Sequence, residues 1–192
     1  MAQNATTKIY ALVDRETLFS RGVSLLSHLE HLKNFDIPIL QYRNKKGSLE
    51  EKKADLLLIR EHYQGILIVN DTVELIEFSD GLHIGQEDIR EYGHNLNESV
   101  TKVRAMIGRK LLGLSTHNLS EIEEANLLDL DYIGLGAYRL TQTKSEANVG
   151  GEALLEAAKH SRHPVGIIGG VKIEDEFEEP ILYKVIGSDL YL

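Results

Sequence analysis

The sequence predicts an α/β protein, a minimal (β/α)8 TIM barrel, and three observations support this fold class. Short apolar segments alternate with helical patterns eight times along the chain. Segments such as ILIV and VGII show little apolar–polar alternation, as expected of parallel strands that are buried on both faces. Polar or charged side chains follow nearly every predicted strand, and barrels of this class carry their sites at those strand ends.

The length of the chain sets its expected domain organisation. The 192 residues suit one domain, so we predict a single barrel over residues 1–192, with residues 1–7 disordered. Such barrels usually have about 250 residues. Only four residues follow Ser188 here, so we expect the last helix to be missing. A doubly wound open sheet is the alternative fold, but no GxGxxG turn follows the first predicted strand.

The first half of the chain predicts four strands and the helices between them. The strands are expected at 8–14, 37–42, 65–71 and 81–84. Apolar residues at helical spacing predict a helix over 18–35, followed later by helices over 48–63 and 71–80. Ser48 with Glu51 three residues on forms a capping box, and Asp71 or Thr72 is expected to cap the short third helix.

The second half repeats the pattern. Helices are expected over 95–108, ended by Gly108, over 119–128, capped by Ser120, and over 150–161. The predicted strands cover 110–118, the start of 131–144, 164–171 and 181–192. The segment 131–144 runs on into a long polar loop, and the acidic run at 172–180 reads as a solvated face with little helix.

Composition excludes several functional classes. The formal net charge of −9 argues against nucleic acid as a partner. The chain has no cysteine, so it forms neither disulfides nor thiolate metal sites. No apolar run approaches the length that spans a bilayer and the N-terminus lacks a signal-peptide core, so we expect a cytoplasmic protein without a membrane partner.

Two strand ends carry carboxylates that predict a magnesium site. GILIVND ends in Asn70 and Asp71, and GLHIGQED ends in a polar cluster that includes Asp88. Mg²⁺ is usually bound by one or two carboxylates together with substrate phosphates and water. The alternatives are that Asp71 only caps a helix and that Asp88 is a surface acid.

Cations and glycines near the same strand ends predict phosphate binding. Arg43, Lys45 and Lys144 lie on loops beside the two acids, which indicates a diphosphate site. Gly169 and Gly170 follow the seventh strand, and Ser188 follows the eighth. Phosphate sites after strands seven and eight are frequent in this fold, although a tight turn would also explain the glycine pair.

The histidines are less informative. His83 lies in a strand between two apolar residues, and it is as readily a core histidine as a catalytic one. Ser115 and Thr116 end the fifth strand, and of this region we favour Ser115 as the functional residue and His117 as a structural one.

Seven stretches together resemble the thiamine-phosphate synthases of the synthase/TenI superfamily. They are YALVDR, QYRNK, IVND, GLHIGQED, GLSTHNLSEI, DYIGLGAYRLTQTK and PVGIIGGV. The resemblance implies a (β/α)8 barrel that is often a homodimer. It also implies an Mg²⁺-dependent transferase that joins hydroxymethylpyrimidine diphosphate to a thiazole phosphate, giving thiamine phosphate and pyrophosphate.

The resemblance assigns roles to individual residues. It implies that Mg²⁺ is held by Asp71 and Asp88, and that the diphosphate is bound by Arg43, Lys45, Asn70 and Lys144. Gln41 would bind the aminopyrimidine, and Ser115 would lie near the reacting carbon and the leaving group. The thiazole phosphate side would be formed by Thr141, Thr143, Gly170, Ile186 and Ser188. The residues expected to be catalytic are Ser115, Lys144 and Arg43.

Two other functions fit the same resemblance. A TenI-like thiazole tautomerase shares the fold, but it does not need the diphosphate-binding residues that this chain retains. A non-catalytic binder descended from the synthase is the third reading, prompted by the short C-terminal part of the chain and by the GAYRLTQTK loop, where the family usually has a proline-bearing GPVFPTxTK. The synthase is the function that the sequence favours.

Overall fold

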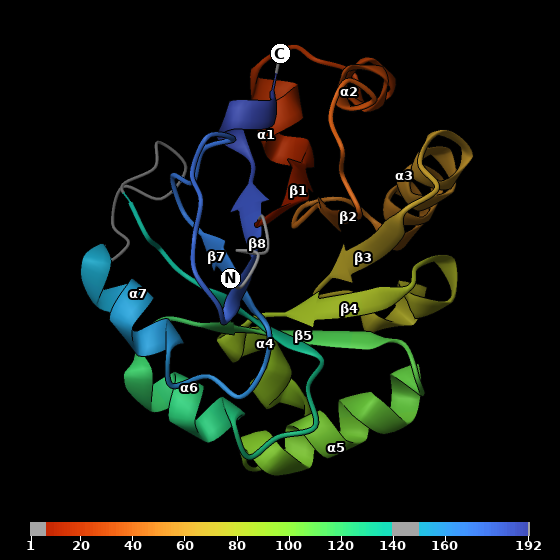
Figure 1. Cartoon of the computed structure of the whole chain (residues 1–192). Coiled ribbons are helices and arrows are strands. Elements are labelled where there is room, and N and C mark those ends of the chain that lie inside the picture. The colour runs from red at the N-terminus through yellow and green to blue at the C-terminus, as the bar shows by residue number, and fades with distance from the viewer. Residues whose placement is uncertain (1–6, 140–149, 192) are drawn as a thin grey trace.

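The protein is a closed barrel of eight parallel strands, as the sequence predicts. The structure, a computed structural model, describes residues 7–139 and 150–191. Each strand pairs with the next, and β1 pairs with β8 to close the barrel (Figure 1). The strands are β1 (Lys8–Asp14), β2 (Ile39–Arg43), β3 (Ile66–Asn70), β4 (Gly81–Ile84), β5 (Leu111–Thr116), β6 (Tyr132–Leu135), β7 (Val165–Ile168) and β8 (Ile181–Ile186).

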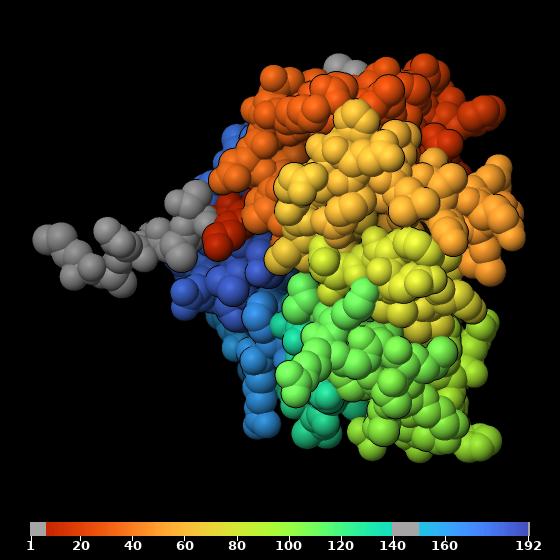
Figure 2. Space-filling model, turned by 90° about the vertical axis from the view of Figure 1, so that its right-hand side faces the viewer, coloured from red at the N-terminus to blue at the C-terminus, as the bar shows by residue number. Residues whose placement is uncertain are grey.

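Helices cover the outside of the barrel, and successive units follow one another around it (Figures 1 and 2). The α-helices are α1 (Arg15–Ser20), α2 (Leu25–Leu32), α3 (Leu49–His62), α4 (Gln86–Ile89), α5 (Leu96–Ile107), α6 (Leu119–Ala125) and α7 (Glu152–Ala158). Short 3₁₀ helices are η1 (Val73–Phe78), η2 (Arg90–Tyr92) and η3 (Ser188–Leu190). Within the described ranges, no helix combines the length and the apolar character that crossing a membrane requires.

The hydrophobic core has two parts. The larger part lies between the strands and the helices and includes fully buried residues such as Leu40, Leu67 and Leu112. The smaller part fills the barrel interior and consists of Tyr10, Ile39, Ile68, Tyr132 and Val185. Since alternate residues of a strand face opposite sides, strands such as β2 and β3 supply residues to both parts, and this explains their near-continuous apolar runs.

The predicted helix over 18–35 is wrong, because the chain forms two helices there. Gly22 adopts a left-handed conformation with φ 69°, which interrupts the helix after Arg21. Ser24 then starts α2, and its hydroxyl accepts a hydrogen bond from the backbone N–H of Ser27 at 3.0 Å.

Two expected caps are also corrected. The N-cap of α6 is Asn118, whose Oδ1 accepts from the Glu121 N–H at 3.0 Å, and Ser120 lies inside the helix. The helix after β3 is the 3₁₀ helix η1, which no side chain caps. The expected capping box of Ser48 and Glu51 and the expected end of α5 at Gly108 are both confirmed.

The acidic run after β7 is not simply a solvated face. Lys184 on β8 is only 5% exposed, and its Nζ donates to the carbonyls of Ile173 and Asp175 and to Glu176 Oε1, at 2.7, 3.0 and 2.9 Å. The Asp175 carboxylate accepts from the Arg139 guanidinium at 2.5 and 3.1 Å. The Lys184 bonds fasten the acidic segment to β8, and the Arg139 bonds fasten it to the segment after β6.

A buried histidine joins α2 to the end of the chain. His28 is 1% exposed and stacks on Tyr191, with ring centroids 4.5 Å apart and an interplanar angle of 9°. Burial, helped by the nearby His31 and Arg21, lowers the pKa of His28 from 6.5 to about 4.

Acidification should therefore destabilise the protein. Unfolded His28 takes up a proton below pH 6.5, whereas the folded protein does so only near pH 4, so stability is lost as the pH falls through that interval. We expect the contribution of His28 to lower the unfolding free energy by about 2 kcal/mol as the pH falls from about 7 to about 5. His28→Phe keeps a ring on Tyr191 and should remove that part of the pH dependence in urea unfolding. Equal pH slopes for both proteins would contradict the prediction.

The corrected cap gives a second prediction. Asn118→Ala should lower the unfolding free energy by about 1 kcal/mol, because it removes the acceptor of an otherwise unpaired helix N–H. Ser120→Ala is the matched control and should stay within about 0.5 kcal/mol of the parent protein. Thermal or urea unfolding of the two variants measures both values. A larger loss for Ser120→Ala than for Asn118→Ala would reverse the assignment.

Candidate active site

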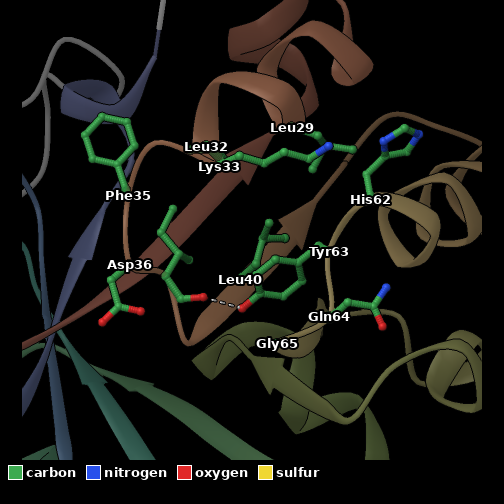
Figure 3. A pocket seen from close by; sticks show the side chains of 11 residues that line it. Leu29, Leu32, Lys33, Phe35, Asp36, Leu40, His62, Tyr63, Gln64 and Gly65 are labelled. Atoms are coloured by element: carbon green, nitrogen blue, oxygen red, sulfur yellow. Dashed lines mark hydrogen bonds between the residues drawn. The ribbon is translucent and has the colours of Figure 1, made fainter.

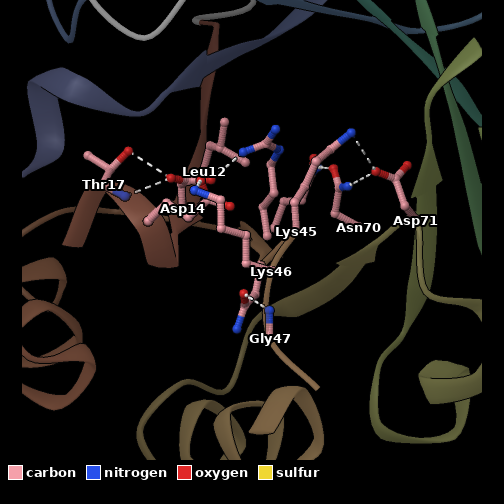
Figure 4. Close-up of polar contacts among 12 residues, drawn as sticks. Leu12, Asp14, Thr17, Lys45, Lys46, Gly47, Asn70 and Asp71 are labelled. Carbon is pink, nitrogen blue, oxygen red and sulfur yellow. Dashed lines mark hydrogen bonds and ion pairs between the residues drawn. The ribbon is translucent and has the colours of Figure 1, made fainter. Parts of the chain in front are cut away.

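The C-terminal rim of the barrel brings the two expected metal-binding acids together. Lys45, on the loop after β2, places its Nζ 3.6 Å from Asp71 Oδ2 (Figure 4). The same Nζ lies 3.9 Å from Asp88 Oδ2. Asp71 follows β3, and Asp88 lies in the first turn of α4 after β4. Parallel neighbouring strands end at one rim, so residues far apart in sequence meet there.

Asp71 is held in an unusual backbone conformation. Its φ is 56°, and among the described residues it is the only non-glycine with a positive φ. Its N–H donates to the His83 carbonyl at 2.9 Å, its Oδ1 accepts from the Gly85 N–H at 2.9 Å, and its Oδ2 accepts from Asn70 Nδ2. A strained residue fixed by this many bonds is typical of functional sites, and the alternative role as a helix cap is excluded by these partners.

Gly85 leaves the space between the two carboxylates open. A Cβ at this position would lie 2.8 Å from Asp88 Oδ2 and 3.7 Å from Asp71 Oδ1. The carboxylates therefore flank one small volume, and the ammonium group of Lys45 already shows that a cation is accommodated beside it. Within residues 7–139 and 150–191, no set of three or more His, Cys, Asp or Glu side chains could hold a metal ion. Two carboxylates plus substrate phosphate and water suit Mg²⁺, so the residues present fit that ion.

Arg43 is anchored by a residue that the sequence did not single out. Its Nη1 donates to Asp14 Oδ2 at the end of β1, and Asp14 Oδ1 also accepts from the N–H and hydroxyl of Thr17, at 2.8 and 2.7 Å (Figure 4). Asp14 is 7% exposed and caps α1. The Asp14 carboxylate thus caps the N-terminus of α1 and also holds the Arg43 guanidinium at the rim.

The loop that carries Lys45 is held from outside the rim. Asn44 Oδ1 accepts from the Gly47 N–H at 2.8 Å, and Asn44 Nδ2 donates to the Tyr42 hydroxyl at 3.1 Å. Tyr42 in turn donates to Asp55 on α3 at 2.6 Å. The loop is therefore tied to the strand before it and to the helix after it.

Gln41 and Ser115 face the barrel interior, near the rim. Gln41 is 5% exposed, and its Nε2 donates to Asn70 Oδ1 at 2.5 Å. Ser115 Oγ lies 3.0 Å from His83 Nε2, and Gln86 Nε2 donates to the Ser115 carbonyl at 2.9 Å. Burial lowers the pKa of His83 to about 4, so the imidazole is neutral near pH 7. His83 is thus an interior residue in contact with the expected catalytic serine, and His117, paired with Glu121 at 2.9 Å, is half exposed.

The expected thiazole phosphate side is only partly described. Thr141, Thr143 and Lys144 lie outside the described residues. Gly170 has φ 61°, and its carbonyl accepts from Arg139 at 3.2 Å. Ser188 begins η3 and is exposed. Ile186 is fully buried in the larger core, so a contact with a ligand would come from its backbone.

Sequence reasoning missed three side chains that contact the site. Asp14 ends the first strand, where a strand-end carboxylate was a usable signal. Tyr10 and Tyr132 gave no signal, because each reads as an ordinary strand residue. Their hydroxyls lie 2.9 Å apart inside the barrel, although 122 residues separate them in the chain.

A separate cavity of about 240 Å³ lies away from this rim, between α2 and α3 (Figure 3). Residues before β2 and β3, including Ile37 and Gly65, form part of its wall, so it belongs to the N-terminal end of the barrel. The Tyr63 hydroxyl donates to the Ile37 carbonyl at 3.0 Å beside it. None of the expected site residues lines this cavity.

Known proteins similar to this chain point to one family. The family model described as thiamine monophosphate synthase matches residues 9–178. The thiamine-phosphate synthase of Caldicellulosiruptor saccharolyticus is 36% identical over 197 residues, covering 94% of this chain and 84% of the relative. That of Caldicellulosiruptor bescii is 34% identical over 176 residues, covering 88% and 75%. The solved thiamine phosphate pyrophosphorylase from Pyrococcus furiosus has a TM-score of 0.67 at 25% identity, covering 86% of this chain and 76% of its own.

The space at Gly85 can be tested directly. Gly85 has φ −76° and ψ 161°, which alanine adopts freely, so Gly85→Ala should fold normally. The added methyl group would crowd Asp88, and we expect the affinity for Mn²⁺ or Mg²⁺ to fall about tenfold in calorimetric titration, equivalent to about 1.4 kcal/mol. Glu87→Ala, at the exposed neighbouring acid, is the control and should bind the ion normally. Equal metal affinities for Gly85→Ala and the parent protein would contradict the predicted position of the metal ion beside Gly85.

Proposed function

Because the chain belongs to the thiamine monophosphate synthase family, we propose that it transfers the hydroxymethylpyrimidine group from its diphosphate to a thiazole phosphate. The products are thiamine phosphate and pyrophosphate. The observation that carries the proposal is the meeting of Asp71, Asp88 and Lys45 within 4 Å at the rim, with Arg43 on the strand that precedes Lys45. Opposite charges arranged in this way suit a diphosphate with a divalent cation.

In the proposed site, Asp71 and Asp88 would hold Mg²⁺. When bound, this ion neutralises charge on the diphosphate and on the departing pyrophosphate. Arg43 would grip phosphate oxygens with its planar guanidinium, and Lys45 would contribute a point charge. Both side chains are partly exposed in the structure, so they can reach a ligand at the rim.

The reaction divides into bond breaking and bond making. The bond between the pyrimidine methylene and the diphosphate oxygen breaks, and its electron pair leaves with pyrophosphate. The methylene becomes cation-like, helped by electron donation from the ring amino group, and the lone pair of the thiazole nitrogen then forms the new bond. Charge stabilisation of the leaving group is the main demand, so the site needs cations at the rim more than it needs a general base.

The interior residues would orient the pyrimidine. Gln41 is already fixed by Asn70 and retains capacity for one more donor and one more acceptor contact. Ser115, at the end of β5, would lie beside the reacting carbon. As the resemblance implies, the diphosphate would also be bound by Lys144. The thiazole phosphate would be bound by Thr141, Thr143 and the backbone of Gly170 and Ser188. We also propose a homodimer, which sedimentation at micromolar concentration would test.

Pyrophosphate release is the decisive assay. The purified protein should release pyrophosphate only when both substrates and Mg²⁺ are present, and Asp88→Ala should lower kcat/KM by about a hundredfold or more, since it removes charge stabilisation of the leaving group. Asp71→Asn keeps a residue that tolerates a positive φ and should show a similar loss. Glu87→Ala should keep the parent activity. Folded protein that binds the pyrimidine diphosphate but releases no pyrophosphate would instead indicate a non-catalytic binder.

A further inference from the structure

We propose that a one-way hydrogen-bond chain through the barrel interior fixes the proton of Ser115, with Tyr10 and Tyr132 as its positioning residues. The Ser115 hydroxyl would then face the substrate as an acceptor only. This hydrogen-bond chain is a property of the free protein. Its meaning for catalysis rests on the proposed function.

The direction of the chain is set at Asp71. Asn70 Nδ2 donates to Asp71 Oδ2, so the amide nitrogen of Asn70 faces this carboxylate. The Asn70 oxygen therefore faces Gln41 and accepts from its Nε2 at 2.5 Å. This leaves the Gln41 oxygen facing the interior, where it accepts from the Tyr10 hydroxyl at 2.8 Å.

The two tyrosines continue the same donor-to-acceptor order along the hydrogen-bond chain. Burial raises the pKa of both hydroxyls above the ordinary value of 10, so each keeps its single proton. The Tyr10 hydroxyl donates its one proton to the hydrogen bond with Gln41. It can therefore only accept a hydrogen bond from the Tyr132 hydroxyl, whose oxygen lies 2.9 Å away. The Tyr132 hydroxyl in turn donates its proton to Tyr10. It must therefore accept a hydrogen bond from its other neighbour, His83 Nδ1, at 3.2 Å.

The histidine completes the chain. A neutral imidazole carries one proton, and the bond to Tyr132 places that proton on Nδ1. Nε2 is then an acceptor, and the Ser115 hydroxyl donates to it across 3.0 Å. The proton of Ser115 is committed to His83, and both lone pairs of its oxygen remain available to the rim.

The ring positions are built into the strands. A Cβ at Gly113 would lie 2.2 Å from the Tyr132 ring, and a Cβ at Gly134 would lie 2.9 Å from His83 Cε1. Gly113 pairs with Tyr132 in the barrel register, and Gly134 pairs with Ser115. Two strand glycines therefore make room for the two rings that link Tyr10 to Ser115.

This arrangement suits the proposed chemistry. An oxygen that offers only lone pairs stabilises a cation-like methylene and accepts from the ring amino group as that group gives up electron density. The same oxygen donates nothing to the leaving pyrophosphate, so neutralising that group falls to the rim cations.

The tautomer of His83 tests the chain without substrate. In ¹⁵N-histidine-labelled protein near pH 7, long-range ¹H–¹⁵N spectra should show the His83 proton on Nδ1, with the signal assigned by its loss in His83→Gln. A proton on Nε2 in the parent protein would overturn the proposal. Because the measurement uses free protein, a failure of the synthase assay leaves its result standing, and the two failures are distinguishable.

Two variants locate the source of the direction. Tyr10→Phe frees the Tyr132 proton for His83 Nδ1, so the imidazole proton should move to Nε2 and kcat should fall about tenfold with a smaller change in KM. Tyr183→Phe is the control, because Tyr183 packs edge-on against Tyr10 at 6.3 Å in the same interior, and it should keep the parent tautomer. An unchanged tautomer in Tyr10→Phe would also overturn the proposal.

Discussion

Closure of the barrel is the constraint on which the rest of the structure depends. Ala11 pairs with Ile186 and with Leu40, so the first strand joins the last and all eight strands end at one rim. Closure leaves no open sheet edge, and it sends alternate side chains into a narrow interior. Both the rim charges and the interior hydrogen bonds follow from that geometry, since each involves residues from different strands.

The rim reconciles an acidic protein with an anionic substrate class. The chain carries a formal net charge of −9, yet Arg43 and Lys45 lie together beside the strand that ends at Asn70. Each cation lies near a carboxylate in the free protein, Arg43 at Asp14 and Lys45 at Asp71 and Asp88. Such pairing keeps long side chains close to the positions that a diphosphate would need, which lowers the entropy lost on binding.

Much of the fold and of the rim could be predicted from the sequence, because the signals were local. The apolar runs predicted eight strands, and the Ser48 capping box and Gly108 marked helix ends correctly. The break at Gly22 was missed because the apolar spacing continues across it. The interior pair of Tyr10 and Tyr132 was out of reach for another reason: their contact depends on barrel closure, which no local pattern encodes.

The tie between Lys184 and the acidic segment bears on how this part of the chain can change over evolutionary time. Two of the three oxygens that Lys184 holds are backbone carbonyls, of Ile173 and Asp175. Backbone acceptors persist whatever side chain stands at those positions, so the identity of residue 173 is free to drift with respect to this bond. Lys184 has no such freedom, since a shorter or uncharged side chain would leave these partly buried carbonyls without their donor. Sequence variation should therefore accumulate on the segment and spare the strand residue that fastens it.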